Sequence, residues 1–442
     1  MSADLARRLG LADSVALVAG TVIGAGIFLT PNLVARQVSS EPVILGFWVL
    51  GAALSFFGAL AYAELGAMMP ATGGPYVFLR ECFGPLAAFL CGWTMLLTVT
   101  SAAVGWLAVS FGLYLGHFLA IPDAWGRAVG AGTVALLTAV NYAGVAAGAT
   151  VQKILTVLKV AGLVGLIAAA GLRGGAPPAP EPAGVTGSLG LALLACLVAY
   201  DGWVAFSLVI GEVRDPQRNV PRALGLGLAI VALLYVGANW AYLRVLSPAE
   251  VAASSRVGAD AAERAIGPVG GSLISAVVLV SIVGSLNGWI LAAPRLFFAQ
   301  ARDGLFFRWF AGVHPRHGTP ARAIVFHSAW SITLVFTGSY TTLVSYAMFA
   351  AWAFYGLSVA GMMRLRMRDP HRARPYRSWG YPVAPALFCL VVAGLMINTL
   401  WTTPAPALAS AALIAAGIPA YYLWTNFFTG ARNSRSSIEP ST

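Results

Sequence analysis

Apolar stretches of about 20 residues recur along this chain and constrain its fold more than any other feature. As a helix, a stretch of this length crosses a hydrocarbon layer roughly 30 Å thick. Each must be helical, because every backbone N–H and C=O has to be paired where no water reaches. Charged residues make up only 10% of the sequence, against about 25% in ordinary globular proteins. The sequence therefore predicts an all-α, polytopic membrane protein.

We expect twelve membrane spans and no cleavable signal peptide, because the first apolar run lacks a small-residue cleavage site. The expected spans are 13–38, 43–69, 83–117, 126–145, 152–173, 188–211, 222–245, 270–299, 323–338, 342–364, 382–401 and 405–428. A proline-rich linker at 174–184 separates the fifth and sixth spans.

The distribution of Lys and Arg sets the expected orientation. If the N-terminus is cytoplasmic, 20 of the 27 basic residues fall on the cytoplasmic side. The sequence therefore predicts a multi-pass protein of the cell (plasma or inner) membrane with both termini in the cytoplasm. The net charge of +11 is explained by this asymmetry and by anionic lipid, so we expect no nucleic-acid partner.

Enzymatic motifs and metal-ligand spacings are missing from the sequence. Its four cysteines show no pairing or metal-ligand pattern and are expected to be buried thiols. There is no HExxH, no GxSxG and no pair of intramembrane carboxylates with a histidine. We expect no enzymatic activity, no metal and no cofactor.

Two expected spans contain glycines that interrupt a helix at matching positions. The first carries Gly24 and Gly26 in "VIGAGIFLTP", and the sixth carries Asp201 and Gly202 in "AYDGW". Such paired interruptions indicate a transporter binding site, although glycines also serve close helix packing. Freed N–H groups attract a carboxylate and freed carbonyls attract an ammonium group, so a zwitterion fits the pair.

Charged and polar residues in the spans are further candidates. Lys159 is expected to be a fixed cation inside the bundle, because it lies too deep to reach the interface easily; snorkelling is the alternative. Asp201 has three open roles: pairing with a substrate cation, proton coupling, or capping a half-helix. Glu64 is expected to form a structural hydrogen bond or gate, and Asn287 to bond across helices. Trp203, Trp289 and Trp352 are candidates for cavity walls.

With these motifs in view, the chain resembles the amino acid–polyamine–organocation superfamily over about residues 9–428. Within it, the chain is similar to the L-type amino acid transporters, which are the light subunits of heteromeric exchangers, and most of all to their bacterial members. The motifs that carry the resemblance are "GTVIGAGIFLTP" at 20–31, "ALAYAELGAMMPATGGPYVFLRECFG" at 59–84, "AYDGW" with "EVRDPQRNVPRA" at 199–223, and "GSLNG" with "RLFFAQARDGLFF" at 284–307.

The resemblance implies a single transporter domain over 1–442 with a LeuT-like five-plus-five inverted repeat. The first repeat would cover 13–173 and the second 188–364, with helices 11 and 12 at 382–428 and a cytoplasmic tail at 429–442. Helices 1 and 6 would be discontinuous.

The resemblance also implies which residues meet the substrate. The N–H groups around Gly24, Ala25 and Gly26 would hold a carboxylate, and the carbonyls near Val22, Val198 and Asp201 an ammonium group. Lys159 would occupy the place of a sodium ion in sodium-coupled relatives. The full set of expected substrate-binding residues is Val22, Ile23, Gly24, Ala25, Gly26, Ile27, Val198, Ala199, Tyr200, Asp201, Gly202 and Trp203, supported by Glu64, Asn287 and Trp352.

Three positions depart from the family pattern. Ala25 stands where serine is common, and Val198 stands where members for large substrates carry an aromatic gate. The stretch "HFLAIPDAW" has no cysteine for a disulfide to a heavy subunit, so we expect none. Asp201 lies in a stretch where some members that accept dibasic amino acids also have aspartate.

We therefore expect a secondary active amino acid transporter that works by alternating access, most simply a sodium-independent antiporter of neutral amino acids. The alternative is a proton-coupled transporter of amino acids, or of cationic amino acids or polyamines. A sensor that binds without transport is a third possibility.

Overall fold

The computed structural model describes residues 5–119, 122–173, 184, 187–338 and 340–426. The expected tail 429–442 and nearly all of the expected linker 174–184 lie outside the described residues. The described chain is helical, and α-helices make up nearly all of its regular structure.

The first half of the chain forms the following elements: α1 (Leu11–Val22), α2 (Gly26–Leu29), α3 (Pro31–Ala35), α4 (Glu41–Met68), α5 (Pro75–Phe83), α6 (Pro85–Thr94), a π-helical turn η1 (Met95–Val99), α7 (Thr100–Leu119), α8 (Asp123–Tyr142) and α9 (Val145–Arg173).

The second half forms α10 (Leu189–Ala199), α11 (Val204–Leu208), η2 (Ile210–Glu212), α12 (Pro216–Val245), α13 (Pro248–Ala253), α14 (Val257–Ile266), α15 (Pro268–Ala292), α16 (Pro294–Arg302), η3 (Arg308–Ala311), α17 (Ala321–Thr337), α18 (Tyr340–Arg368), α19 (Val383–Thr402) and α20 (Pro404–Trp424).

Proline marks where many of these helices begin. It occupies the first turn, where its missing N–H leaves no helical bond unmade. The residues concerned include Pro31, Pro75, Pro85, Pro216, Pro268, Pro294 and Pro404.

Nine helical stretches within the described residues are long and apolar enough to cross a membrane. They are Leu11–Leu29, Glu41–Met68, Pro85–Gly116, Val145–Leu172, Pro216–Val245, Pro268–Arg302, Leu343–Arg368, Val383–Thr402 and Pro404–Trp424. The other three expected spans coincide with α8, with α10 and α11, and with α17. The membrane class is confirmed, and nine spans are found by length and composition.

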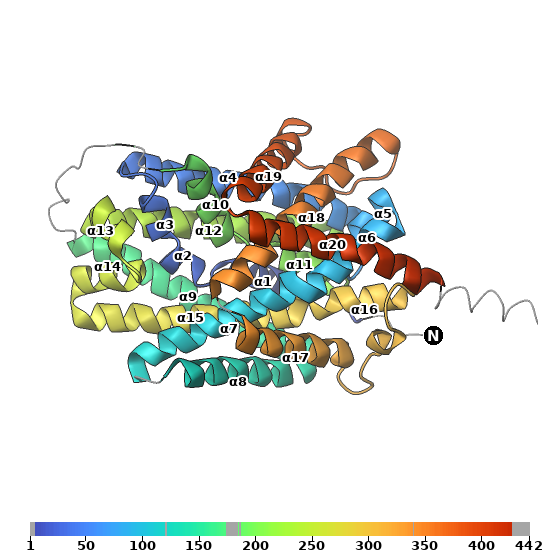
Figure 1. The fold of residues 1–442 in the computed structure, drawn as a ribbon, viewed down its shortest axis with the longest axis horizontal. Coiled ribbons are helices and arrows are strands. Elements are labelled where there is room, and N and C mark those ends of the chain that lie inside the picture. The colour runs from blue at the N-terminus through green and yellow to red at the C-terminus, as the bar shows by residue number, and fades with distance from the viewer. Residues whose placement is uncertain (1–4, 120–121, 174–183, 185–186, 339, 427–442) are drawn as a thin grey trace, which may run out of the picture.

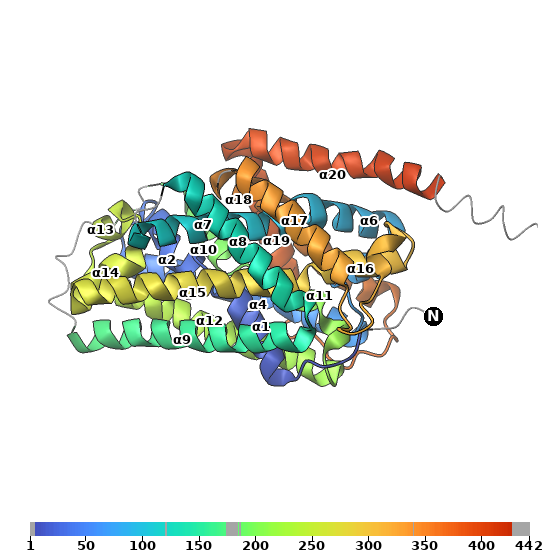
Figure 2. The same cartoon turned by 90° about the horizontal axis from the view of Figure 1, so that it is seen from below.

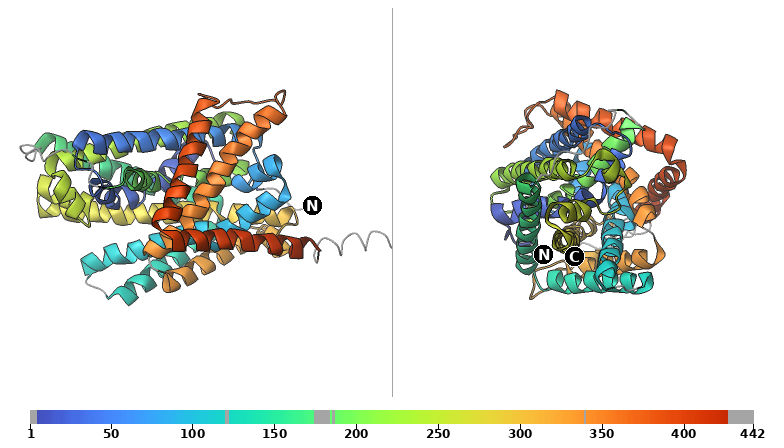
Figure 3. Two further views of the ribbon diagram at one scale, coloured as in Figure 1. Left: turned by 45° about the horizontal axis from the view of Figure 1, so that its top comes forward. Right: turned by 90° about the vertical axis from the view of Figure 1, so that its left-hand side faces the viewer.

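The helices form an elongated bundle in which α1 is central and α20 peripheral. The first helix contacts α9, α12 and α15 along its length. By contrast, α20 lies along the outside of the bundle (Figure 2), and α19 crosses it obliquely (Figure 3). Two-thirds of the α1–α2 stretch is buried but only 17% of α20. The interrupted segments therefore lie in the interior, where free backbone groups have no lipid contact.

The two ends of the bundle are distinct. The N-terminus, the C-terminal end of α20 and α16 lie at one end, here called the N-terminal end (Figure 1). Short helices α13 and α14 lie at the opposite end (Figure 1). Both termini of the described chain thus lie on one side.

Three of the four cysteines are buried and all four are free thiols. Cys82, Cys91 and Cys196 are buried, and Cys389 is partly buried. The expectation of buried thiols is confirmed for the first three.

Candidate functional site

The two expected interruptions are present, each as a non-helical segment between two helices. The first runs from Ile23 to Ala25, between α1 and α2, and the second from Tyr200 to Trp203, between α10 and α11. The second half of the first span begins at Gly26, and Pro31 begins the next short helix.

The two interruptions pack directly against each other. A Cβ added at Gly26 would lie 3.0 Å from the Cα of Ala199, and one at Gly202 would lie 2.8 Å from the carbonyl oxygen of Thr21. Gly202 also has φ of +118°, which side chains rarely adopt. Glycine is therefore required at these positions for the backbones to touch.

Substituting Gly202 with alanine is expected to destabilise the fold by about 2 kcal/mol or more, because it combines an unfavourable φ with a backbone overlap. Thermal unfolding of the purified protein measures this. Gly46→Ala is the matched control, because a Cβ at Gly46 on α4 meets nothing within 4 Å. It should leave the melting temperature unchanged or slightly raised. Equal melting temperatures for the two variants would contradict the close packing.

Free backbone donors collect at the first interruption. The Gly24 N–H donates to the Val22 carbonyl at 2.7 Å. No acceptor within the described residues is recorded for the N–H groups of Ala25, Gly26 and Ile27. Buried N–H groups are nearly always paired, so these three are suited to an anionic group of a ligand.

The carbonyl end of α1 is neutralised by Lys159, which is fully buried. Its Nζ donates to the carbonyl oxygen of Gly20 at 2.6 Å and to that of Ile23 at 2.7 Å. Ser285 Oγ lies 3.2–3.3 Å from the carbonyls of Gly20, Thr21 and Ile23. Tyr235 donates its hydroxyl to the Val22 carbonyl at 2.8 Å. Lys159 therefore does not snorkel: it ties α9 to the end of α1.

A small cavity of about 50 Å³ lies between the interruptions. Seven of the expected substrate-binding residues line it: Val22, Gly24, Ala25, Gly26, Val198, Ala199 and Asp201. The remaining lining residues are Thr21, Thr30, Trp106, Leu107, Ser285, Trp289 and Val344.

The other expected substrate-binding residues lie behind this lining. Tyr200 packs on Tyr235 with ring centres 4.9 Å apart, and Trp203 packs edge-on against Tyr62 at 5.0 Å. Ile23 and Ile27 are buried side chains, and Gly202 contributes its close approach to α1. Their contact with a ligand stays a prediction.

Asp201 is not the N-cap of α11. The N-cap residue of α11 is Trp203, and its side chain forms no capping hydrogen bond. One carboxylate oxygen of Asp201 is buried without a hydrogen-bond partner in the described structure. The same carboxylate lies beside the Gly202 N–H and the Tyr355 hydroxyl. Its role toward a ligand stays a prediction.

The supporting residues lie away from the cavity. Asn287 donates to the Gly148 carbonyl at 3.0 Å and to the Gln152 side chain at 2.9 Å, and accepts from Asn141 at 2.9 Å. It thus bonds α15 to α8 and α9, as expected for a residue that bonds across helices. Trp352 is packed against Tyr355 and Phe388 and does not line the cavity.

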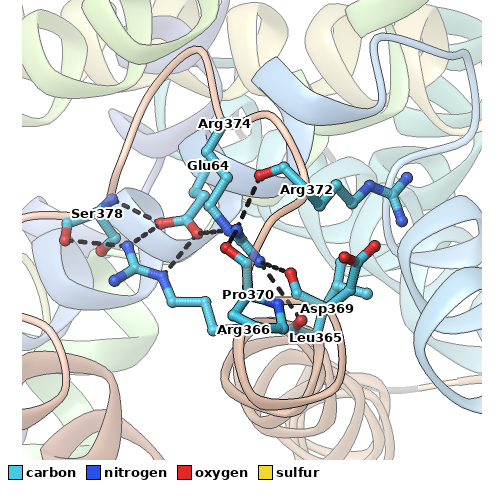
Figure 4. A network of polar contacts seen from close by, with 8 residues as sticks. All are labelled: Glu64, Leu365, Arg366, Asp369, Pro370, Arg372, Arg374 and Ser378. Atoms are coloured by element: carbon cyan, nitrogen blue, oxygen red, sulfur yellow. Dashed lines mark hydrogen bonds and ion pairs between the residues drawn. The ribbon is translucent and has the colours of Figure 1, made fainter.

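Glu64 is the centre of a polar cluster toward the N-terminal end. Its buried carboxylate lies between the guanidinium groups of Arg366 and Arg374 (Figure 4). Arg366 Nε donates at 2.8 Å and the Ser378 N–H at 2.6 Å. The cluster holds the segment after α18 against α4.

A buried ion pair lies toward the N-terminal end, and a larger pocket adjoins the cavity on the other side. Glu212 and Arg295 form a fully buried ion pair at 2.8 Å, and the Leu9 N–H donates to the Glu212 carbonyl at 2.9 Å. At the opposite end a pocket of about 410 Å³ shares Thr30 with the cavity.

Sequence reasoning missed six of the lining residues: Thr21, Thr30, Trp106, Leu107, Ser285 and Val344. Ser285 stands within the quoted "GSLNG" stretch, so its proximity to Asn287 was a usable signal. Trp106 and Val344 carried no signal, because only the packing of α7 and α18 brings them to the cavity.

Comparison with known proteins yields a consistent set of relatives. A family profile described as amino acid permease matches residues 9–424. A serine/threonine exchanger of Bacillus subtilis is 33% identical over 427 residues, which cover 95% of this chain and 97% of the relative. The human cystine/glutamate transporter is 31% identical over 434 residues, covering 95% and 86%. The human large neutral amino acids transporter small subunit 2 is 31% identical over 436 residues, covering 95% and 80%.

Proposed function

The chain belongs to the amino acid permease family, and its relatives named above are transporters and not enzymes; we propose that it exchanges neutral amino acids across the cell membrane without sodium. The observation that carries the proposal is the pair of touching helix interruptions around a buried cavity. Within the described residues, N–H groups without an acceptor lie on one side of that cavity and the Asp201 carboxylate on another.

Lys159 supports sodium independence. A fixed ammonium group bonds the carbonyls of Gly20 and Ile23, which would otherwise be available to a metal cation. A second cation at the same carbonyls would meet strong repulsion in this buried place. Transport would then draw on exchange of one amino acid for another.

Alternating access requires the site to be closed on one side at a time. We infer twelve spans arranged as a five-plus-five inverted repeat, 13–173 and 188–364, with the N-terminal end in the cytoplasm. The Glu212–Arg295 pair would then seal the cytoplasmic path, and the 410 Å³ pocket would open outward. The missing cysteine between α7 and α8 supports a transporter that needs no disulfide-linked subunit.

Counterflow in proteoliposomes tests the proposal. Unlabelled alanine inside the vesicles should accelerate uptake of labelled alanine at least about tenfold, equally with sodium or choline outside. This is expected because an obligatory exchanger changes between its two open states only when an amino acid is bound. If a pH gradient drives uptake into vesicles without internal amino acid as fast as counterflow does, exchange is contradicted and the proton-coupled alternative is favoured.

A further inference from the structure

A second pocket, of about 360 Å³, lies at the N-terminal end of the bundle, where the N-terminus and α16 meet (Figure 1). It shares no lining residue with the cavity between the helix interruptions. Its walls come from the segment before α1, the loop between α4 and α5, α5 itself, η2 and the end of α16. The function proposed above uses none of these residues, so the pocket needs an explanation of its own.

Three arginines and one aspartate line this pocket, here called the arginine pocket: Arg7, Arg80, Arg302 and Asp303. Arg80 on α5 forms an ion pair with Asp303, and the Tyr76 hydroxyl donates to the same carboxylate at 2.8 Å. The carboxylate therefore offsets one of the three positive charges. The pocket keeps an excess of positive charge, which attracts an anion.

The backbone that carries Arg7 is held against the bundle. The Leu9 N–H donates to the Glu212 carbonyl at 2.9 Å, and the Leu9 carbonyl accepts from the Arg214 N–H at 2.9 Å. Leu5 and Leu9, on either side of Arg7, are only 7% and 2% exposed. Arg7 therefore extends from a fixed piece of chain, so binding a ligand orders little more than its own side chain.

Arg302 is positioned by an aromatic ring. The central carbon of its guanidinium group lies 5.7 Å from the ring centre of Phe298, which stands one turn earlier on α16 and is 1% exposed. A guanidinium group stacked on a ring still presents N–H donors at its edges. On another wall, the Thr72 N–H has no acceptor recorded within the described residues. Donors of two kinds thus come from different walls of the arginine pocket.

These donors match a phosphate group better than a carboxylate. A guanidinium group binds phosphate oxygens through two parallel N–H bonds, and a phosphate has further oxygens for a second guanidinium group. The pocket also has apolar walls at Leu5, Val77 and Phe298, which suit the carbon chain of a lipid beside its head group. Basic pockets between membrane helices are suited to lipid head groups for this reason.

We propose that the arginine pocket binds a phosphate group, which Arg7 and Arg302 hold from two different segments. A phospholipid head group and a soluble phosphorylated compound share this chemistry. A phosphate bound there joins the segment before α1 to the end of α16 and stabilises the described conformation. The inference goes beyond the proposed function and does not depend on the amino acid that is exchanged, because the pocket is separate from the cavity.

Thermal unfolding of the full-length protein in detergent measures this binding with two probes. Glycerol 3-phosphate carries the phosphate alone, and dioleoyl phosphatidic acid carries the same group with two acyl chains. A ligand that binds only the folded protein raises the melting temperature as its concentration rises. Both probes should do so, phosphatidic acid at the lower concentration because its chains meet the apolar walls. Dioleoylglycerol, which has the chains without the phosphate, should not.

Substitution of the two arginines tests their part in the site. Arg7→Gln and Arg302→Gln should each raise the half-saturating concentration of phosphatidic acid about tenfold or more, because each removes charge-assisted hydrogen bonds. Arg316→Gln is the matched control, because Arg316 is an exposed arginine on the loop before α17 and does not line the pocket. It should bind phosphatidic acid as the wild-type protein does.

The outcomes also identify the source of the phosphate. A shift with phosphatidic acid alone, or at the lower concentration, supports a membrane lipid, and a shift with glycerol 3-phosphate at an equal or lower concentration supports a soluble compound. No shift with either probe overturns the site. Wild-type binding by the Arg7→Gln or the Arg302→Gln protein overturns it too, and so does an equal loss in Arg316→Gln, which would mean that only surface charge matters. None of these readouts measures transport, so a failure of the proposed exchange function would leave them unchanged.

Discussion

Replacing Lys159 with alanine is expected to reduce amino acid exchange at least about 100-fold while the protein still inserts and purifies. The substitution removes two short charge-assisted bonds, to the carbonyls of Gly20 and Ile23. Each is worth about 1.5–3 kcal/mol, and a loss of about 3 kcal/mol in the working geometry corresponds to about 100-fold. The end of α1 would lose its link to α9. The free N–H groups that follow α1 would then no longer be held in a fixed position. Counterflow of labelled alanine measures the loss.

Lys153 is the matched control for this experiment, because it lies on the same helix. It pairs with Asp13 at 2.8 Å and its side chain is 44% exposed. Such a pair contributes little, so Lys153→Ala should retain at least about half of the wild-type rate. Full exchange by the Lys159→Ala protein would mean that the ammonium group has no part in the site.

Replacing Glu64 with alanine is expected to lower the free energy of unfolding by about 3–5 kcal/mol. The buried carboxylate compensates Arg366, whose side chain is 16% exposed, and Arg374, which is 4% exposed. Removing one partner of a buried pair leaves an uncompensated charge in a poorly solvated place. The Ser378 N–H would lose its acceptor as well. A lower melting temperature in detergent measures the effect.

Glu81 provides the comparison for Glu64. It also pairs with two arginines, Arg368 and Arg372, but its side chain is 41% exposed. Glu81→Ala should therefore cost less than about 1 kcal/mol. If both substitutions lower the melting temperature equally, burial of the Glu64 cluster is not what stabilises the segment after α18.

Much of the fold was predictable because the apolar stretches are long and proline marks many helix starts. The two interruptions were predictable too, since Gly24, Gly26 and Gly202 stand where a membrane helix would ordinarily avoid them. Lys159 was predictable as a buried cation, because an intramembrane charge must have a partner. Its partners, Gly20 and Ile23, are backbone carbonyls, and a backbone carbonyl leaves no mark in the residue pattern.

The details of the cavity were not predictable from one sequence. Nothing in the sequence distinguishes Trp106 and Trp289 from Trp203 and Trp352. Of these four tryptophans, only Trp106 and Trp289 line the cavity. The difference depends on the rotation of each helix about its axis, which is set by contacts between segments far apart in the chain. The short helices α13 and α14 were missed because they are too short and too polar to be counted as membrane spans.

The central claim is that an amino acid binds between the two interruptions. Ala25 lines the cavity, and cysteine adds only one sulfur atom to the alanine side chain, so cysteine should be accommodated at this position. In an Ala25→Cys protein with Cys389 replaced by serine, the remaining native thiols, Cys82, Cys91 and Cys196, are buried. The measurement is the rate at which a small thiol reagent modifies Cys at position 25, with and without alanine. We expect saturating alanine to slow modification at least about fivefold; an unchanged rate, in a protein that still exchanges alanine, would place the binding site elsewhere.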